Sequence, residues 1–454
     1  MTTIDPKPAE PATASETGPV TSAAYRAWVL FILVVVYTFN FIDRQITGIL
    51  AVPIKADLNL ADWQLSLMGG MAFALFYTFL GIPIAMFADR TSRTWIMTIA
   101  LSVWSLMTAV CGLAQNFWHL FFARLGVGVG EAGGVAPAYS LISDYFPPHQ
   151  RARALSIYSF GIPIGSALGI ILGGILTDII GWRAAFIIVG LAGLAIAPIF
   201  RLTMREPVRG QYDSKDADRS PAKLSAVFAL LRSKGSFWTL AFGAASSSMM
   251  GYGLIFWLPS FFVRSFGEQL PEFMGFLPGF LLPADPTPIS YAAYFYGTIL
   301  FFGGMIGIWL GGALADRFGG NNKGAYALIP AWAFVATIPF FLVGVLVDNL
   351  TFVFISFVCL QALSLVWLGP VLTAFQHLVG PNMRATASAI FLFINNLIGI
   401  GLGNFIIGLI SDGLRDRFGD ESLRYAILSG FGFYVLAAVL LFITAPKLKR
   451  DWVG

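Results

Sequence analysis

Charged residues are scarce in this sequence. They make up 11% of its 454 residues, against 57% for apolar residues, whereas a soluble domain carries about 25% charged residues. So little charge excludes an ordinary soluble domain. The apolar residues lie in runs of about 20, long enough to cross the hydrocarbon core of a bilayer, and the runs lack the alternation of barrel strands. We therefore predict an all-α polytopic membrane protein.

Cysteine and histidine are also rare. Cys111 and Cys359 fall in separate apolar runs, and the three histidines are far apart in the sequence. No spacing typical of metal ligands, no phosphate-binding loop and no ordered acid–base set is present. We therefore expect no metal, no cofactor and no enzymatic activity. The basic residues lie between apolar runs and form no stripe, so nucleic acid is not an expected partner.

The apolar runs predict twelve membrane spans in two six-helix bundles. The predicted spans are 25–53, 64–88, 95–113, 118–143, 153–177, 184–202, 236–266, 290–313, 325–348, 352–379, 385–411 and 425–446. The predicted domains are a disordered tail (1–24), an N-terminal bundle (25–202), a charged linker (203–235), a C-terminal bundle (236–446) and a short tail (447–454).

The basic residues predict the orientation of the spans. Most of the 28 lysines and arginines fall in the tails, in the linker and in the loops after even-numbered spans. Because loops rich in lysine and arginine stay on the cytoplasmic side, we expect both termini in the cytoplasm. We expect the protein itself in the plasma (inner) membrane. We expect a monomer in contact with membrane lipids.

A repeated loop divides the chain into equal halves. Residues 85–93 read AMFADRTSR and residues 312–319 read GALADRFG, so that Asp89-Arg90 and Asp316-Arg317 recur in register. Duplication of one loop is typical of two-repeat transporters. The loop resembles the motif Gly-x-Leu-Ala-Asp-Arg-x-Gly-Arg of the major facilitator superfamily, with Arg93 as its last residue. The resemblance implies that these residues form a conformational latch, each aspartate lying at a helix N-terminus or pairing with an arginine. A solvated turn is the plainer alternative.

Four charged residues lie deep inside predicted spans. They are Asp43 and Arg44 in the first span, and Arg124 and Glu131 in the fourth. At 1.5 Å per residue Asp43 is about 15 Å deep, and Arg124 and Glu131 are about 10 and 20 Å deep. Arg124, Gly128 and Glu131 share one helix face, and Gly128 permits close approach of another backbone. Because buried charges need partners, the spacing predicts one mutually paired cluster.

Such a cluster suits proton transfer. An apolar setting favours the protonated carboxyl and a nearby guanidinium favours the ionised form, so a partner that comes and goes would load and release a proton. A carrier built on this cluster would thus be coupled to protons. A permanent, purely structural pair of salt bridges is the alternative.

Two segments resemble the spinster family within this superfamily. Residues 40–50 (NFIDRQITGIL) are similar to its first helix, and residues 144–169 are similar to its loop and fifth helix. Residues 124–132 (RLGVGVGEA) resemble the superfamily's fourth-helix motif. The Asn-x-x-Asp-Arg pattern also occurs in organic anion–cation symporters. The spinster resemblance implies a proton-driven transporter of an amphipathic anionic lipid, such as a lysophospholipid or sphingoid phosphate. It also implies that Asp43 and Glu131 carry the proton, and that Arg44 and Arg124 pair with them or with the anionic head group. The alternative is a symporter of small hydrophilic anions resembling hexuronates.

Other polar residues in apolar runs are weaker candidates for the cavity lining. They are Asn40, Tyr252, Gln361, Asn395 and Asn396. Intramembrane amides often bond to a neighbouring helix without further function. The glycines at 161, 165, 169 and 173 form a stripe in the fifth span, for which tight helix packing is a sufficient explanation.

Overall fold

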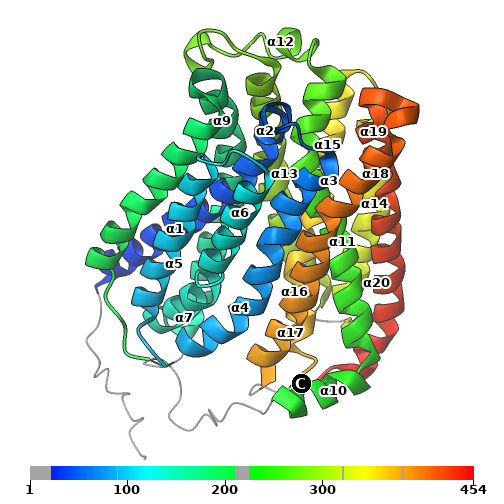
Figure 1. Ribbon diagram of the computed structural model, residues 1–454. Helices are drawn as coiled ribbons and strands as arrows, with labels where there is room; N and C mark the ends of the chain where they lie inside the picture. Colours follow the sequence, from blue (N-terminus) through cyan, green and yellow to red (C-terminus); the bar gives the residue numbers. More distant parts are fainter. Residues whose placement is uncertain are drawn as a thin grey trace, which may run out of the picture.

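The computed structural model describes residues 22–88, 90–209, 212, 224–319, 322–379 and 383–453, and these residues form helices and no strand. Figure 1 shows two groups of long helices side by side, one from each half of the chain. Most of the predicted tail (1–21) and part of the predicted linker (210, 211 and 213–223) lie outside the described residues.

The described residues of the first half form nine α-helices and one π-helix. They are α1 (Ala23–Ile49), α2 (Ala51–Leu58), α3 (Asp62–Ser66), the π-helix η1 (Leu67–Met71), α4 (Ala72–Ala88), α5 (Arg93–Cys111), α6 (Phe117–Glu131), α7 (Val135–Tyr145), α8 (Pro148–Ser159) and α9 (Gly161–Thr203).

The second half follows α10 (Leu224–Ser233), which lies in the predicted linker. Its elements are α11 (Gly235–Phe266), α12 (Leu270–Phe273), η2 (Gly279–Leu281), α13 (Pro288–Gly319), α14 (Ala325–Leu346), α15 (Leu350–Leu365), α16 (Leu368–Gln376), α17 (Arg384–Asn396), the π-helix η4 (Leu397–Leu402), α18 (Gly403–Phe418), η5 (Gly419–Glu421), α19 (Ser422–Ser429) and α20 (Phe431–Asp451).

These elements make the twelve predicted passes. Eight helical stretches of the described chain are long and apolar enough to cross a membrane. Two of them, 153–203 and 387–451, contain two passes each, and α6–α7 and α11 supply the remaining two. Several predicted spans are interrupted: α6 and α7 are separated at 132–134, and the first span ends at Ile49, before the separate helix α2.

The long element α9 contains a reversal of the chain. Gly173 faces Ile49 at the end of α1, whereas Tyr25 near the start of α1 donates a hydrogen bond to the carbonyl oxygen of Thr203, with the two oxygens 3.0 Å apart. Gly181, at φ 79° and ψ 162°, makes this reversal, because glycine adopts positive φ without a side-chain clash. The fifth and sixth predicted spans are therefore two antiparallel helices joined at Gly181.

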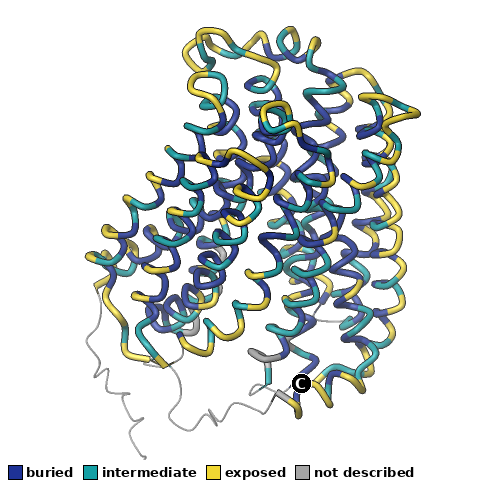
Figure 2. Tube along the Cα trace, viewed as in Figure 1, coloured by how far each residue is buried: buried dark blue, intermediate teal, exposed yellow. Residues whose placement is uncertain are grey.

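We call the end of the bundle where α1 begins and where α9 and α20 end the termini end, and the end that holds α2 and α12 the far end (Figure 1). Figure 2 shows buried residues along the interior of each helix group and exposed ones along the outside. Many exposed side chains are large and apolar, such as Phe122 and Trp309, which is 71% exposed. Lipid contact explains them, since a soluble protein rarely exposes such a surface.

Candidate functional site

The four intramembrane charges form two ion pairs inside the first half. Arg44 Nε lies 2.7 Å from Glu131 Oε2, and Arg124 Nη1 lies 3.3 Å from Asp43 Oδ1. Three of these side chains are 3% exposed or less, and Arg44 is 12% exposed. We call these four residues the charge cluster. The expected mutual pairing of α1 with α6 is therefore present.

Small residues let the neighbouring helices approach the cluster. A Cβ at Gly128 would lie 2.5 Å from the carbonyl oxygen of Phe73, so α4 packs backbone to backbone on α6. A Cβ at Gly169 would lie 2.7 Å from the carbonyl oxygen of Ile42. The glycine stripe of α9 thus packs tightly against α1, which holds Asp43 and Arg44 in place.

Arg44 has an aromatic surround. Its guanidinium carbon lies 4.9 Å from the ring centroids of both Phe73 and Tyr77, and 5.1 Å from that of Phe41. Aromatic faces attract a cation, most strongly where water is absent. Arg44 thus has a favourable environment besides Glu131, whereas no ring contact to Arg124 is present among the described residues.

The cluster also contains polar atoms without partners. Asp43 Oδ2, Glu131 Oε1, Arg44 Nη2 and Arg124 Nε are buried and make no hydrogen bond to any described residue. Such atoms are rare in native proteins and call for an explanation. Each ion pair therefore keeps free hydrogen-bonding capacity on both its acidic and its basic member.

A small pocket lies beside the cluster, between the two halves. Its walls come from α1, η1, α4 and α6 in the first half and from α11, η4 and α18 in the second. Arg44 and Arg124 both line it. We call it the central pocket. Its remaining lining consists of Gln45, Gly48, Gly69, Phe73, Tyr252, Ile255, Phe256, Ile400 and Asn404.

Only one of the predicted cavity residues, Tyr252, lines this pocket. Asn40 is buried on α1 with its Oδ1 unpartnered. Asn395 accepts a hydrogen bond from Ser248 Oγ at 2.8 Å, Gln361 packs α15 on α13, and Asn396 is half-buried on α17. For Asn40, Gln361, Asn395 and Asn396 a place in the cavity lining stays a prediction, because a polar residue type alone does not specify a helix face.

Sequence reasoning missed two polar residues of the pocket, Gln45 and Asn404. Gln45 follows Arg44 directly, which was the available signal. The π-helices η1 and η4, which contact each other across the halves, were also missed. A Cβ at Gly70 of η1 would lie 2.8 Å from the carbonyl oxygen of Ile400 in η4. Such π-helical turns are frequent at functional sites.

The duplicated loop behaves differently in the two halves. Arg93 is buried and pairs with Asp144 at 2.5 Å and with Glu206 at 2.8 Å. Glu206 also accepts a hydrogen bond from the backbone N–H of Thr94 at 3.0 Å, so this carboxylate occupies the N-terminus of α5. Arg90 is exposed, and Asp89 lies outside the described residues.

In the second half, Asp316 and Arg317 lie exposed in the last turn of α13. Asp316 therefore does not lie at the N-terminus of its own helix, and its role in a conformational latch stays a prediction. Nor does it form an ion pair within the described ranges. Arg317 lies with its guanidinium carbon 5.5 Å from the ring centroid of Phe318.

An ionic network joins the two halves at the far end. The buried Asp62 of α3 accepts hydrogen bonds from Arg264 Nη1 and Nη2, at 3.0 and 2.9 Å, and from Ser411 at 3.0 Å. Asp412 in turn accepts a hydrogen bond from the backbone N–H of Trp63, with Trp63 N 2.7 Å from Asp412 Oδ2. We call these contacts the far-end network. It holds α3 against α11 and α18.

Comparison with known proteins identifies the family to which this architecture belongs. The sequence profile of the Major Facilitator Superfamily matches residues 33–404. The chain belongs to this superfamily, and within it to the spinster-like transporters. Protein spinster homolog 1 of Mus musculus is 31% identical over 87% of this chain and 74% of its own length. An "MFS-type efflux pump" of Mycolicibacterium smegmatis is 30% identical over 94% of both chains.

Solved structures of a bacterial homologue of the human lysosomal transporter Spinster are also similar. The inward-facing, unoccupied form matches with a TM-score of 0.81 and 32% identity, and covers 96% of this chain and 100% of its own. The inward-facing, occupied form matches with a TM-score of 0.79. These relatives are transporters, which agrees with the prediction of a transport protein.

Proposed function

We propose that this chain is a proton-coupled secondary transporter that works by alternating access, and that its cargo is an amphipathic anionic lipid such as a lysophospholipid or a sphingoid phosphate. The observation that carries the proposal is the charge cluster, two carboxylate–guanidinium pairs buried beside a pocket between the halves. We further propose that it is a monomer of the inner membrane with both termini in the cytoplasm.

The proposal of proton coupling rests on the buried polar atoms of the cluster that have no hydrogen-bond partner. Glu131 keeps Oε1 free while its other oxygen binds Arg44. If Arg44 turns from Glu131 towards an anionic cargo in the central pocket, Glu131 loses its compensating charge and takes up a proton. Return of Arg44 releases that proton. Binding of the head group and binding of the proton would thereby be linked through Arg44.

An amphipathic cargo needs an apolar region as well as a charged one. A pocket of about 600 Å³ near the termini end lies between α4, α10 and α17, and is lined by Ile82, Ser225, Phe228, Ile390 and Phe393. Its wall is almost entirely apolar, unlike the central pocket. This pocket favours a lipid tail over the alternative cargo, a hydrophilic hexuronate-like anion, for which every wall should be polar.

Transport by purified protein in liposomes tests the coupling. Glu131→Gln and Asp43→Asn should each abolish accumulation driven by a pH gradient, because an amide keeps the shape of the carboxyl without titrating. Glu272→Gln, the same change at an exposed position in α12, should leave it intact. Full response of both cluster variants to the gradient would show that the cluster is structural.

Binding measurements test the cargo. A single-chain lipid phosphate should raise the melting temperature of the native protein by mass action, and Arg44→Ala should weaken this response more for an anionic lipid than for a neutral one. Arg417→Ala, which removes an exposed arginine of α18, serves as the control. Saturable binding of a hexuronate, with no effect of any single-chain lipid, would favour the alternative.

A further inference from the structure

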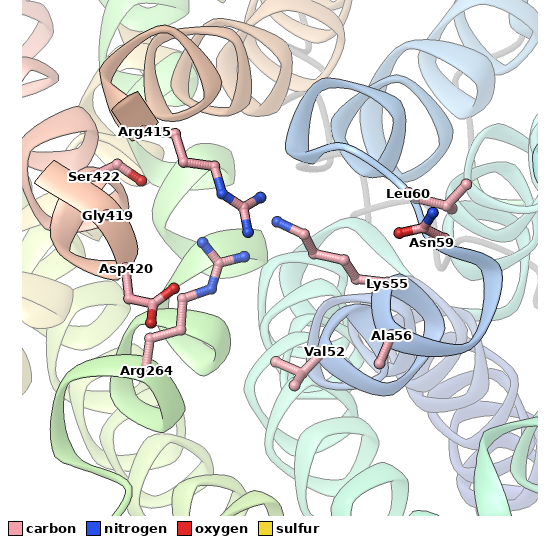
Figure 3. A pocket seen from close by; sticks show the side chains of 10 residues that line it. All are labelled: Val52, Lys55, Ala56, Asn59, Leu60, Arg264, Arg415, Gly419, Asp420 and Ser422. Atoms are coloured by element: carbon pink, nitrogen blue, oxygen red, sulfur yellow. The ribbon is translucent and has the colours of Figure 1, made fainter. Parts of the chain in front are cut away.

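A second pocket lies at the far end, away from the charge cluster. It has a volume of about 350 Å³ and is walled by α2 and the residues after it, by α11, and by the turn that joins α18 to α19. We call it the far-end pocket. Three basic side chains line it, Lys55, Arg264 and Arg415, against a single carboxylate, Asp420. The three cationic ends point towards one another (Figure 3).

The backbone builds this pocket through two unusual residues. Asn59 ends α2 in the left-handed region at φ 51°, and Gly419 ends α18 at φ 56°. Both residues line the pocket. Asparagine and glycine are the residues that adopt positive φ most readily, so the local sequence favours turns that bring α2 opposite Arg415.

The carboxylates nearby do not neutralise the three cations. Asp62, behind the wall, is shared by Lys55 at 2.5 Å and by Arg264. Asp412 is directed to the backbone N–H groups of α3. Arg415 is exposed and forms no ion pair with any residue that the structure describes. The wall therefore carries an excess of positive charge in a partly enclosed space.

The pKa of Lys55 responds to this excess of positive charge. Burial lowers the pKa of Lys55, and the positive charges of Arg264 and Arg415 lower it further, against the opposing effect of Asp62. Two guanidinium groups and an ammonium group facing a single hollow are the donors that oxyanions bind best, because the planar fork of arginine matches a phosphate or carboxylate.

We propose that the far-end pocket is a binding site for a phosphate-type oxyanion, held by Lys55, Arg264 and Arg415. The site is separate from the transport site and independent of the proposed function. Lys55 belongs to the first half, and the two arginines belong to the second. A bound oxyanion would therefore bridge the halves beside the far-end network and favour the conformation that is closed at this end.

Inorganic phosphate and a matched pair of variants test the site. The full-length protein in detergent is titrated with sodium phosphate against sodium chloride at equal ionic strength, and its melting temperature is followed by tryptophan fluorescence. Arg415→Gln removes an exposed cation of the pocket. Arg417→Gln removes an exposed arginine of the same helix that does not line it. Arg415→Lys keeps the charge but loses the planar fork.

We expect a saturable rise of a few degrees for the native protein and for Arg417→Gln, a smaller rise for Arg415→Lys and none for Arg415→Gln. A second titration compares lysophosphatidic acid with lysophosphatidylcholine. A rise that needs both Arg415 and a phosphomonoester lipid, without a response to free phosphate, would assign the site to a lipid head group. Equal responses of Arg415→Gln and Arg417→Gln to both phosphate ligands, or no response beyond that to chloride, would overturn the proposal.

Discussion

The two ion pairs of the charge cluster should differ in how well they tolerate loss of the acidic partner. Asp43→Asn leaves Arg124, a side chain 1% exposed, without its carboxylate. Glu131→Gln leaves Arg44, which is 12% exposed and lies within 5.1 Å of three aromatic ring centroids. Both variants keep the size of the side chain. Any difference between them therefore reports the surroundings of the orphaned arginine.

The size of the stability loss expected for each variant follows from the surroundings of the orphaned arginine. Removing one partner of a buried ion pair destabilises a protein by about 3–5 kcal/mol, and Arg124 should show this full effect. For Arg44 the aromatic faces offset up to about 2 kcal/mol where water is excluded. We therefore expect Glu131→Gln to be destabilised by about 1–2 kcal/mol less than Asp43→Asn.

Thermal unfolding of the purified variants in one detergent measures the difference. The double variant Asp43→Asn/Arg124→Gln is the control: it removes both charges, so no uncompensated charge stays buried, and it should be more stable than Asp43→Asn alone. Equal melting temperatures of the two single variants, or a lower one for Glu131→Gln, would refute the role assigned to the aromatic rings. Failure of the double variant to recover would refute the pairing of Asp43 with Arg124.

Three further predictions concern packing, pH and topology. Gly128→Val should reduce the yield of folded protein, because its Cβ would lie 2.5 Å from a backbone oxygen, whereas Gly81→Val has no heavy atom within 4 Å; size-exclusion chromatography compares the two. Burial would raise the pKa of Glu206, but hydrogen bonds from Thr94 and Arg93 outweigh it and hold that pKa below its usual value. The contact at the N-terminus of α5 should therefore be complete above about pH 4.3 and be lost as the pH falls through the lower folded pKa, which protease sensitivity of residues 203–209 would reveal. A cysteine at position 213 should react with an impermeant maleimide only from the cytoplasmic side, and labelling from outside would overturn the predicted orientation.

The twelve passes and the charge cluster could be predicted from the sequence because both are rare patterns. An ionised residue within an apolar run stands out, and only a few partners are available to it, so the sequence predicts that the four charges pair with one another. It does not predict which carboxylate pairs with which arginine, here Arg44 with Glu131. The structure places them 2.7 Å apart. Close helix packing at Gly128 could be predicted for a similar reason, since glycine within a membrane helix permits approach of a backbone.

The far-end network and the far-end pocket could not be predicted. Asp62, Arg264 and Arg415 stand near predicted span ends, where charged residues are ordinary and any of them could face water. Their meeting depends on how the two halves dock, and one sequence carries no direct signal of that. The second copy of the repeated loop matches the motif, yet Asp316 is exposed in this conformation, so its role as a latch stays a prediction.

The positions of the polar contacts indicate what alternating access would require. Asp62 with Arg264, and Asp178 with Thr287, join the halves at the far end. The buried network of Arg93 at the termini end contacts Asp144 and Glu206, both from its own side of the chain. An outward movement must therefore break the far-end network and form new contacts at the termini end.

Within the cluster, Arg44 is suited to transmit this change. It is the most exposed of the four charges and lines the central pocket, where Tyr252 of the second half lies opposite. Arg124 also lines the pocket but is enclosed with Asp43. Protonation of Glu131 would release Arg44 towards the second half without disturbing the other pair. The proposed coupling thus needs one arginine that moves and one that stays in place. The more exposed Arg44 suits the first role, and the more deeply buried Arg124 suits the second.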